Sequence, residues 1–349
     1  MKRWILLGMA VIAVNAVAAP YEVLGVKLDV VAAQETPEVM LGEPGFVKFK
    51  VCNPSGRPLW LELGGDYRNR LGRPNSFRIE TVGPDGKKVA QPDSGMDMGG
   101  MIHEVKLPAK GEGAVDLFLP HWATFEKPGT YTMTIRRKLT VFERNAANMA
   151  GKSGSVEVTA TATVTVVPAD AAKMGHLIDR LGQQMVARGA EYERAEKMLT
   201  AIRDERVVPH FVALAELPHD SPRAAACDPL GRYNSDPAFA ALKKLSKTTA
   251  AEVRDGSTTL ALAESSADGV RHSAAHALGT SPHPKALPYL WTLVDDRYYG
   301  VRMTVLHKAF EVKTPEARAI VRKLTADENE RVRDEAKRYQ KLLDAGADK

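Results

Sequence analysis

Three methionines and a histidine lie close together in the N-terminal half of the chain. They are Met96, Met98, Met101 and His103, with Gly99-Gly100 between them. Thioether and imidazole groups are ligands that suit copper(I). The paired glycines are also typical of an ordinary turn, and methionine often serves as a packing residue. The segment makes copper handling one hypothesis for this chain.

A second group of reactive side chains lies in the C-terminal half. His276, His307 and Arg338 follow one another at equal intervals. On the outer face of successive helices they would form a column that could bind anionic groups, more strongly as pH falls through the histidine range. His272 precedes His276 by one helical turn, a spacing that can suit a metal, but no nearby carboxylate or cysteine completes a zinc ligand set. An ordinary solvated surface explains the same residues.

No catalytic motif accompanies these groups. The chain has no Gly-x-Ser-x-Gly, no His-Glu-x-x-His, no phosphate-binding glycine loop and no dinucleotide fingerprint. Catalytic residues need not be adjacent in sequence, so this absence is weak evidence alone. Because nothing positive supports an enzyme, we expect a protein without catalytic activity and without a cofactor.

The elements that would carry the histidine column repeat along the chain. The dipeptide Val-Arg begins at positions 270, 301 and 332, so successive copies are evenly spaced. A fixed period of this length indicates stacked supersecondary units. The same spacing relates three further sets of residues: Leu262, Leu293 and Leu324; Ala274, Val305 and Ala336; and Asp296 and Asp327.

Each unit is predicted to be a helical hairpin whose second helix opens near Val-Arg. At 100° per residue, the residues two and six positions after the valine point away from the core. Asp296 and Asp327 fall near the start of this helix, where they can cap backbone amides. Arg271, Arg302 and Arg333 are expected to bridge neighbouring units or to pair with these aspartates.

The segment Asp268-Gly-Val-Arg-His-Ser-Ala-Ala-His-Ala-Leu-Gly279 resembles the short HEAT repeats, including the subgroup named for phycobiliprotein lyases. The resemblance covers roughly 256–343 as three units. It implies an α-solenoid that binds proteins, and it does not imply lyase activity. Residues 207–252 align less well, as one or two degenerate units in which Pro229 should break a helix. Residues 169–206 are expected to form a helical cap on the solenoid, which extends over 207–349.

Residues 19–168 show the alternation of apolar and polar residues that is typical of strands. Val47, Phe49 and Val51 fall on one face of such a strand. The segment Pro128-Gly-Thr-Tyr131 resembles the entry to a late strand in bacterial immunoglobulin-like domains. There the tyrosine packs at a corner and hydrogen-bonds to backbone. We therefore expect an Ig-like antiparallel β-sandwich in front of the solenoid.

The segment 1–18 resembles a secretory signal. Lys2 and Arg3 precede an apolar stretch, and Ala16-Val17-Ala18 supplies the pattern for cleavage after Ala18. The mature protein would be periplasmic or secreted, without stable membrane insertion. Cys52 and Cys227 fall in different halves, which favours free or buried thiols over a bridge.

The charge of the chain is small and spread out. Lys2 and Arg3 contribute two of the formal net charge of +5, and no concentrated basic tract follows them. This distribution excludes a typical nucleic-acid binder. The leading hypothesis is an exported, non-enzymatic adaptor that binds another protein or a glycan. The alternatives are an accessory subunit of an exported enzyme and a periplasmic copper-handling protein.

Overall fold

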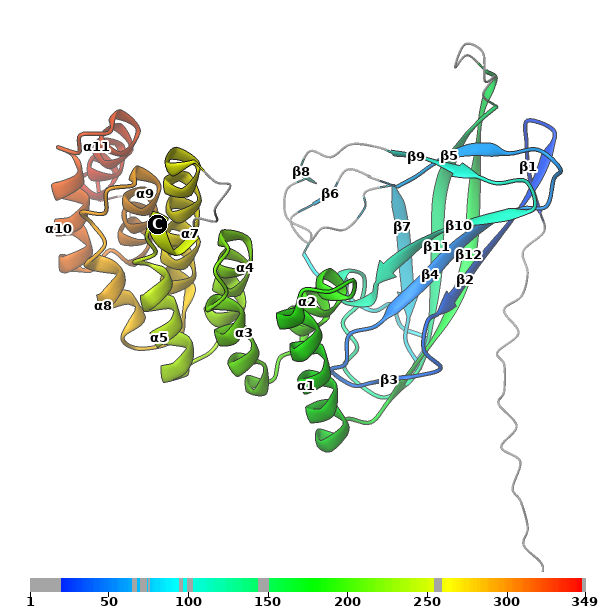
Figure 1. Cartoon of the computed structure of the whole chain (residues 1–349), viewed down its shortest axis with the longest axis horizontal. Coiled ribbons are helices and arrows are strands. Elements are labelled where there is room, and N and C mark those ends of the chain that lie inside the picture. Colours follow the sequence, from blue (N-terminus) through cyan, green and yellow to red (C-terminus); the bar gives the residue numbers. More distant parts are fainter. Residues whose placement is uncertain are drawn as a thin grey trace, which may run out of the picture. The chain divides into compact units, whose positions relative to one another are not determined.

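The computed structural model describes residues 20–64, 68–69, 74, 76–93, 97–98, 103–143, 151–253 and 259–346. The chain divides into two compact units, Met1–Met174 and Gly175–Lys349. The first is rich in strands and the second is helical (Figure 1). The predicted signal, 1–18, lies outside the described residues. Met96 and Met101 lie outside them as well, as do the side chains of Met98 and His103.

The N-terminal unit contains two main sheets. The first has the order β1-β2-β4-β10, and the second has the order β3-β12-β11-β5-β9, with β7 also pairing with β11. A short pair, β6-β8, stands apart. The strands are β1 (Tyr21–Val23), β2 (Val26–Gln34), β3 (Val39–Met40), β4 (Phe46–Asn53), β5 (Leu59–Gly64), β6 (Arg68–Asn69), β7 (Phe77–Val82), β8 (Asp97–Met98), β9 (His103–Leu107), β10 (Gly111–Phe118), β11 (Gly129–Phe142) and β12 (Ser153–Val167).

The two main sheets enclose one apolar core. Val47 and Phe49 of β4 are fully buried there, together with Met133 and Ile135 of β11. They come from alternate positions of their strands, because successive side chains of a strand point to opposite faces. The predicted β-sandwich architecture is therefore confirmed.

Tyr131 lies near the start of β11 and belongs to the core of this sandwich. The residue is 2% exposed, and its hydroxyl donates to the carbonyl of Lys127 at 2.7 Å. This is the backbone contact that the Pro-Gly-x-Tyr segment predicts.

One strand pairing departs from the wholly antiparallel sheet that we predicted. Val39 and Met40 of β3 pair with Val166 and Val167 of β12 in parallel. The strand β3 lies in the connection between β2 and β4, which belong to the other sheet. The chain therefore crosses to the second sheet for this short strand, and the direction of that crossing sets the parallel pairing.

The C-terminal unit is built from helices that follow one another as hairpins. We call α3, α5, α8 and α10 the A helices, and α4, α7, α9 and α11 the B helices. Residue ranges are α1 (Ala171–Ala187), α2 (Tyr192–Ala201), α3 (Val208–Ala215), α4 (Asp220–Leu230), α5 (Asp236–Leu245), α6 (Ala250–Val253), α7 (Leu260–Thr280), α8 (Ala286–Trp291), α9 (Tyr299–Val312), α10 (Pro315–Leu324) and α11 (Glu330–Asp344). Short 3₁₀ turns occupy Leu119–His121 and Glu205–Val207. Successive B helices contact one another along the stack (Figure 1).

Leu262 shares the spacing of Leu293 and Leu324 but does not lie in a separate first helix. Residues 260–280 form one continuous helix, α7, in which Leu262 is 61% exposed. No glycine or proline interrupts 260–268, and the side chain of Thr259 caps the helix by accepting from the amide of Leu262. Ala263 and Ala267 of this extension pack against Val253. The A helix that precedes α7 is α5, which lies in the segment 207–252 that was expected to hold degenerate units.

Pro229 falls in the last turn of α4, and the helix ends directly after it, at Leu230. Cys52 is half-buried and Cys227 is buried, and both are free thiols. In the described part of the chain, no helix is both long and apolar enough to cross a membrane.

Candidate binding surfaces of the helical repeats

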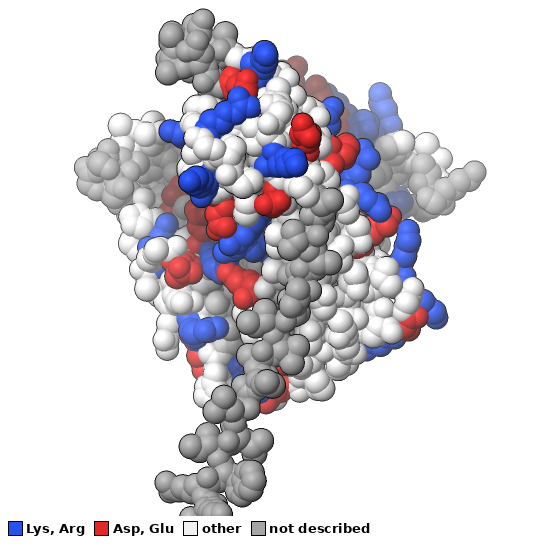
Figure 2. All heavy atoms as spheres, turned by 90° about the vertical axis from the view of Figure 1, so that its right-hand side faces the viewer, with Lys and Arg blue, Asp and Glu red and all other residues white. Residues whose placement is uncertain are grey.

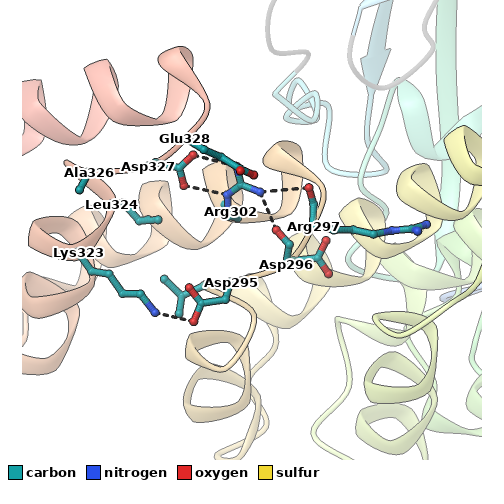
Figure 3. Close-up of a pocket in the computed structure, with 10 residues that line it drawn as sticks. Asp295, Asp296, Arg297, Arg302, Lys323, Leu324, Ala326, Asp327 and Glu328 are labelled. Atoms are coloured by element: carbon teal, nitrogen blue, oxygen red, sulfur yellow. Dashed lines mark hydrogen bonds and ion pairs between the residues drawn. The ribbon is translucent and has the colours of Figure 1, made fainter.

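Arg302 of α9 links the α8/α9 hairpin to the α10/α11 hairpin (Figure 3). The residue is 5% exposed. Its Nε and Nη2 donate to the two carboxylate oxygens of Asp327, each at 2.8 Å. Its Nη1 donates to the carbonyls of Asp296 and Arg297 at 2.7 and 3.1 Å. The planar guanidinium therefore binds a carboxylate of the next unit and a turn of its own unit at once.

Arg271 of α7 makes the corresponding link one unit earlier. The residue is 4% exposed, and its Nε donates to Asp296 at 3.2 Å. Its Nη2 donates to Asp268 at 2.7 Å, and its Nη1 donates to the carbonyl of Thr248 at 3.3 Å. In both links the arginine precedes its aspartate by 25 residues. The two pairs form a ladder that joins three hairpins.

Arginine occupies equivalent positions in four B helices, as Arg223, Arg271, Arg302 and Arg333. All of them except Arg271 also bind the turn of their own hairpin. The acceptor is the carbonyl six residues earlier for Arg223 at 2.8 Å, for Arg302 at 2.7 Å and for Arg333 at 2.9 Å. Arg271 differs because the residue six positions before it lies inside the extended helix α7, where carbonyls bond within the helix. The carbonyl of Thr248, from the segment between α5 and α7, takes that place.

The ladder aspartates close turns rather than cap helices. Asp296 accepts from the amide of Tyr298, and Asp327 accepts from the amide of Asn329, both at 2.8 Å. The cap of α11 is Asn329, whose side chain accepts from the amide of Arg331 at 3.1 Å. The aspartates thus accept from backbone amides near the start of the second helix, as expected, but the N-cap position itself is the second residue after each aspartate.

A hollow of about 260 Å³ lies beside this ladder, between the α8–α9 turn and the α10–α11 turn (Figure 3). Its charged lining consists of Asp295, Asp296, Arg297, Arg302, Lys323, Asp327 and Glu328. Lys323 donates to Asp295 at 2.5 Å, and Arg302 is paired with Asp327. The charges of the hollow thus largely satisfy one another. Among the described residues, no group of histidine, cysteine or acidic side chains could hold a metal ion.

The structure places His272, His276, His307 and Arg338 on the exposed side of the B helices. The valines that begin each repeat, by contrast, are fully buried. The four polar residues therefore lie on the face that helical geometry assigned to them. Arg338 is already engaged there, because its Nε donates to Glu335 of the same helix at 2.9 Å. This hydrogen bond lowers the pKa of Glu335 below its ordinary value.

Aromatic side chains that the sequence analysis did not single out join this face. Tyr339 stacks on Phe310 with ring centroids 4.0 Å apart, and the centroid of the His307 ring lies 5.9 Å from that of Tyr339. The Arg338 guanidinium lies 5.0 Å from the centre of the Tyr339 ring. One unit earlier, His272 lies 6.2 Å from the ring of Tyr298. Spacing could not reveal this group, because its aromatic members do not recur with the period of the repeat.

His272 lies beside the column, one helical turn before His276. Partial burial lowers the pKa of His272, and the proximity of His276 lowers it further. His272 therefore loses its proton at a lower pH than an ordinary histidine does. The anion-binding column of His276, His307 and Arg338 stays a prediction. Its residues lie on a surface that also carries aromatic rings, and Arg338 is paired with Glu335.

A family model described as HEAT repeats matches residues 257–339 of this chain. The C-terminal half therefore carries HEAT repeats, a module of protein–protein interaction. No curated protein matches the sequence.

Several solved structures resemble parts of the chain. The protein YibA of Escherichia coli shares 15% identity over 52% of this chain and 80% of its own, with a TM-score of 0.26. A PapD-like domain of human CEP192 shares 10% identity over 45% of this chain and 98% of its own, with a TM-score of 0.23. The bacterial hydrophobin BslA shares 12% identity over 41% and 95%, with a TM-score of 0.17. These scores are too low to carry an argument about function.

Proposed function

We propose that this HEAT-repeat protein is an exported adaptor that binds another protein through the exposed face of its B helices. One observation carries the proposal: the histidines of α7 and α9 share this face with the stacked pair of Phe310 and Tyr339. Tyrosine is over-represented among the residues that dominate binding energy at protein interfaces. Partly buried rings also lose little conformational entropy when a partner covers them.

The surface formed by the α8–α9 and α10–α11 turns is a weaker candidate for a partner-binding site than the exposed face of the B helices. Arg302 and Asp327 there are nearly buried and bind each other, so a ligand would have to break an existing pair. Figure 2 faces the strand-rich side of Figure 1, and basic and acidic side chains are interspersed on the surface that it shows. That face therefore gives no support for a highly charged ligand such as nucleic acid.

Export is the second part of the proposal. It rests on Lys2 and Arg3, on the apolar stretch after them and on the small residues Ala16 and Ala18. Cell fractionation tests it, because the processed protein should appear outside the cytoplasm and should be retained inside when residues 2–18 are deleted.

Site-specific photo-crosslinking tests the binding face. A photoreactive phenylalanine analogue is introduced at His276 or at His307, and each chain is expressed in its source cells and irradiated. We expect one discrete adduct of higher mass from both positions, which mass spectrometry then identifies. Agreement between the two positions matters, because they lie on neighbouring helices of one face.

The matched control places the same analogue at Arg322, an exposed residue of the A helix α10. We expect no adduct there. Equal adducts at Arg322 and His276, or none at either histidine, would count against the proposed face. If the adduct contains an exported enzyme, the protein is an accessory subunit of that enzyme. If the adduct carries carbohydrate in place of protein, the ligand is a glycan.

The copper hypothesis depends on Met96, Met98, Met101 and His103, whose side chains the described structure does not cover. Titration of the purified chain with copper(I) tests it independently of the crosslinking. Binding no tighter than about micromolar would eliminate copper handling.

A further inference from the structure

Arg333 of α11 occupies the position in the α10/α11 hairpin that Arg302 occupies in the preceding one. Its Nη1 donates to the carbonyls of Asp327 and Glu328 at 2.9 and 3.2 Å. The Nη1 of Arg302 donates in the same way to the carbonyls six and five residues before it. The turn therefore fixes both guanidinium groups in the same orientation.

The remaining donors of the two arginines differ. The Nε and Nη2 of Arg302 bind both oxygens of Asp327. Within the part of the chain that the structure describes, the Nε and Nη2 of Arg333 have no acceptor. The side chain of Arg333 is half-buried. A fork held in place by two carbonyls is pre-organised for a carboxylate, so binding costs less side-chain entropy than at a mobile arginine.

The side of α11 that carries Arg333 is polar where the corresponding side of α9 is apolar. Leu306 and Ala309 of α9 are fully buried. Their equivalents one repeat later are Lys337, which is exposed, and Gln340. A further hairpin could not stack here through apolar contacts, and a polar outer face is typical of a terminal unit. What this face offers is charge complementarity.

The cationic side chains of this face form a stripe along α11. Lys337 and Lys341 follow Arg333 at successive helical turns, which places the three cations along one side of α11. Glu330 and Asp344 lie near the two ends of the stripe. Asp344 accepts a hydrogen bond from Gln340 at 2.7 Å. The excess of cations between these ends suits an acidic segment.

We propose that this side of α11 docks an acidic segment of a partner protein, with one carboxylate bound by Arg333 as Asp327 is bound by Arg302. The preferred ligand is an aspartate that closes a turn, because that is the form in which Asp327 itself is presented. The surface is separate from the histidine and tyrosine face of the proposed function.

The test uses the full chain and a fluorescent dodecapeptide of alternating Asp and Gly, with an Asn-Gly peptide as its uncharged counterpart. Binding is measured by anisotropy at low ionic strength. We expect the Asp peptide to bind and the Asn peptide not to bind. The substitution Arg333→Gln should weaken binding at least about fivefold, because it removes a charge-assisted fork. Arg333→Lys, which keeps the charge but lacks the fork, should weaken it by a smaller factor.

Arg331→Gln is the matched control, because it removes the same charge from another exposed position of α11. It should leave peptide binding within about twofold of the unaltered chain. Equal losses in the Arg331 and Arg333 variants would overturn the proposal, as would no binding of the Asp peptide at millimolar concentration. Helical circular dichroism checks that each variant is folded. Replacement of His276 should not change peptide binding, so failure here and failure of the proposed function are distinguishable.

Discussion

The pair of Arg302 and Asp327 should contribute more to the stability of the helical array than any surface ion pair near it. The substitution Asp327→Asn keeps an oxygen that can accept from the amide of Asn329. It removes the negative charge and presents an amide N–H₂ to one guanidinium donor. The side chains of Arg302 and Asp327 are 6% and 5% exposed, so water cannot replace the lost acceptor.

The expected cost follows from these contacts. A hydrogen bond to a charged group contributes about 1.5–3 kcal/mol, and one of the two from Arg302 to Asp327 is lost outright. Removing one member of a buried pair costs about 3–5 kcal/mol in general. Glu328, which lies 3.3 Å from Nη2 of Arg302 and is 83% exposed, offsets part of the loss. We therefore expect Asp327→Asn to lower the free energy of unfolding by about 2–3 kcal/mol.

Asp295→Asn is the matched control, because Asp295 pairs with Lys323 on the surface, where the side chains are 74% and 51% exposed. An exposed pair of this kind contributes less than about 1 kcal/mol. The assay is urea denaturation at neutral pH, followed by the helical signal in circular dichroism. Similar losses for the two variants would refute the reasoning that burial makes the ladder pair stronger.

The pH dependence of the same variant provides an internal check. Burial alone would raise the pKa of Asp327, but the hydrogen bonds from Arg302 and from the amide of Asn329 outweigh it and hold the pKa below its ordinary value. A depressed carboxyl pKa contributes stability above the unfolded-state value of about 3.9 and loses it as pH falls through the folded-state value. The difference between the unaltered chain and the Asn variant should thus shrink below about pH 4.

Three further predictions concern other parts of the chain. Burial raises the pKa of the Cys227 thiol to about 12. At about pH 8, iodoacetamide should therefore modify Cys52 in the folded protein and Cys227 only after unfolding. Equal modification of both thiols in the folded protein would contradict the burial of Cys227. N-terminal sequencing of the protein from its source cells should begin after Ala18, and an intact Met1 would exclude cleavage. By NMR, His272 should titrate below the ordinary histidine value of 6.5, and His276→Ala should raise its pKa; an unchanged pKa in that variant would show that the two rings do not interact.

The even spacing of the Val-Arg dipeptides predicted the parts of the solenoid in which every unit has the same length. It located the buried valines of α9 and α11 and indicated that the repeated arginines pair with aspartates; the structure shows that each partner lies 25 residues later. Such positions are predictable because stacked hairpins place equivalent residues in equivalent surroundings. The exposure of His276 and His307 followed from the same geometry, since a residue six positions after a buried valine points outward.

The parts that could not be predicted depend on contacts between segments of irregular length. Leu262 has the spacing of a repeat residue, yet it lies in the N-terminal extension of α7. This hairpin differs from the others because a longer segment of chain separates its A helix, α5, from its B helix, α7. The carbonyl of Thr248 reaches Arg271 only because of that insertion. The stacking of Phe310 on Tyr339 joins residues whose separation differs from the repeat period, and no pattern of the sequence indicates it.

The most direct test of the binding face is the affinity of the crosslinked partner for variants of the folded chain. Isothermal titration compares the unaltered protein with Tyr339→Ala and with Arg322→Ala, the control on α10. A residue that dominates an interface costs more than about 1 kcal/mol when truncated, so Tyr339→Ala should raise the Kd about tenfold. Arg322→Ala should leave it unchanged. An unchanged Kd for Tyr339→Ala, in a variant with unaltered helical content, would contradict the claim that the partner binds the B helices.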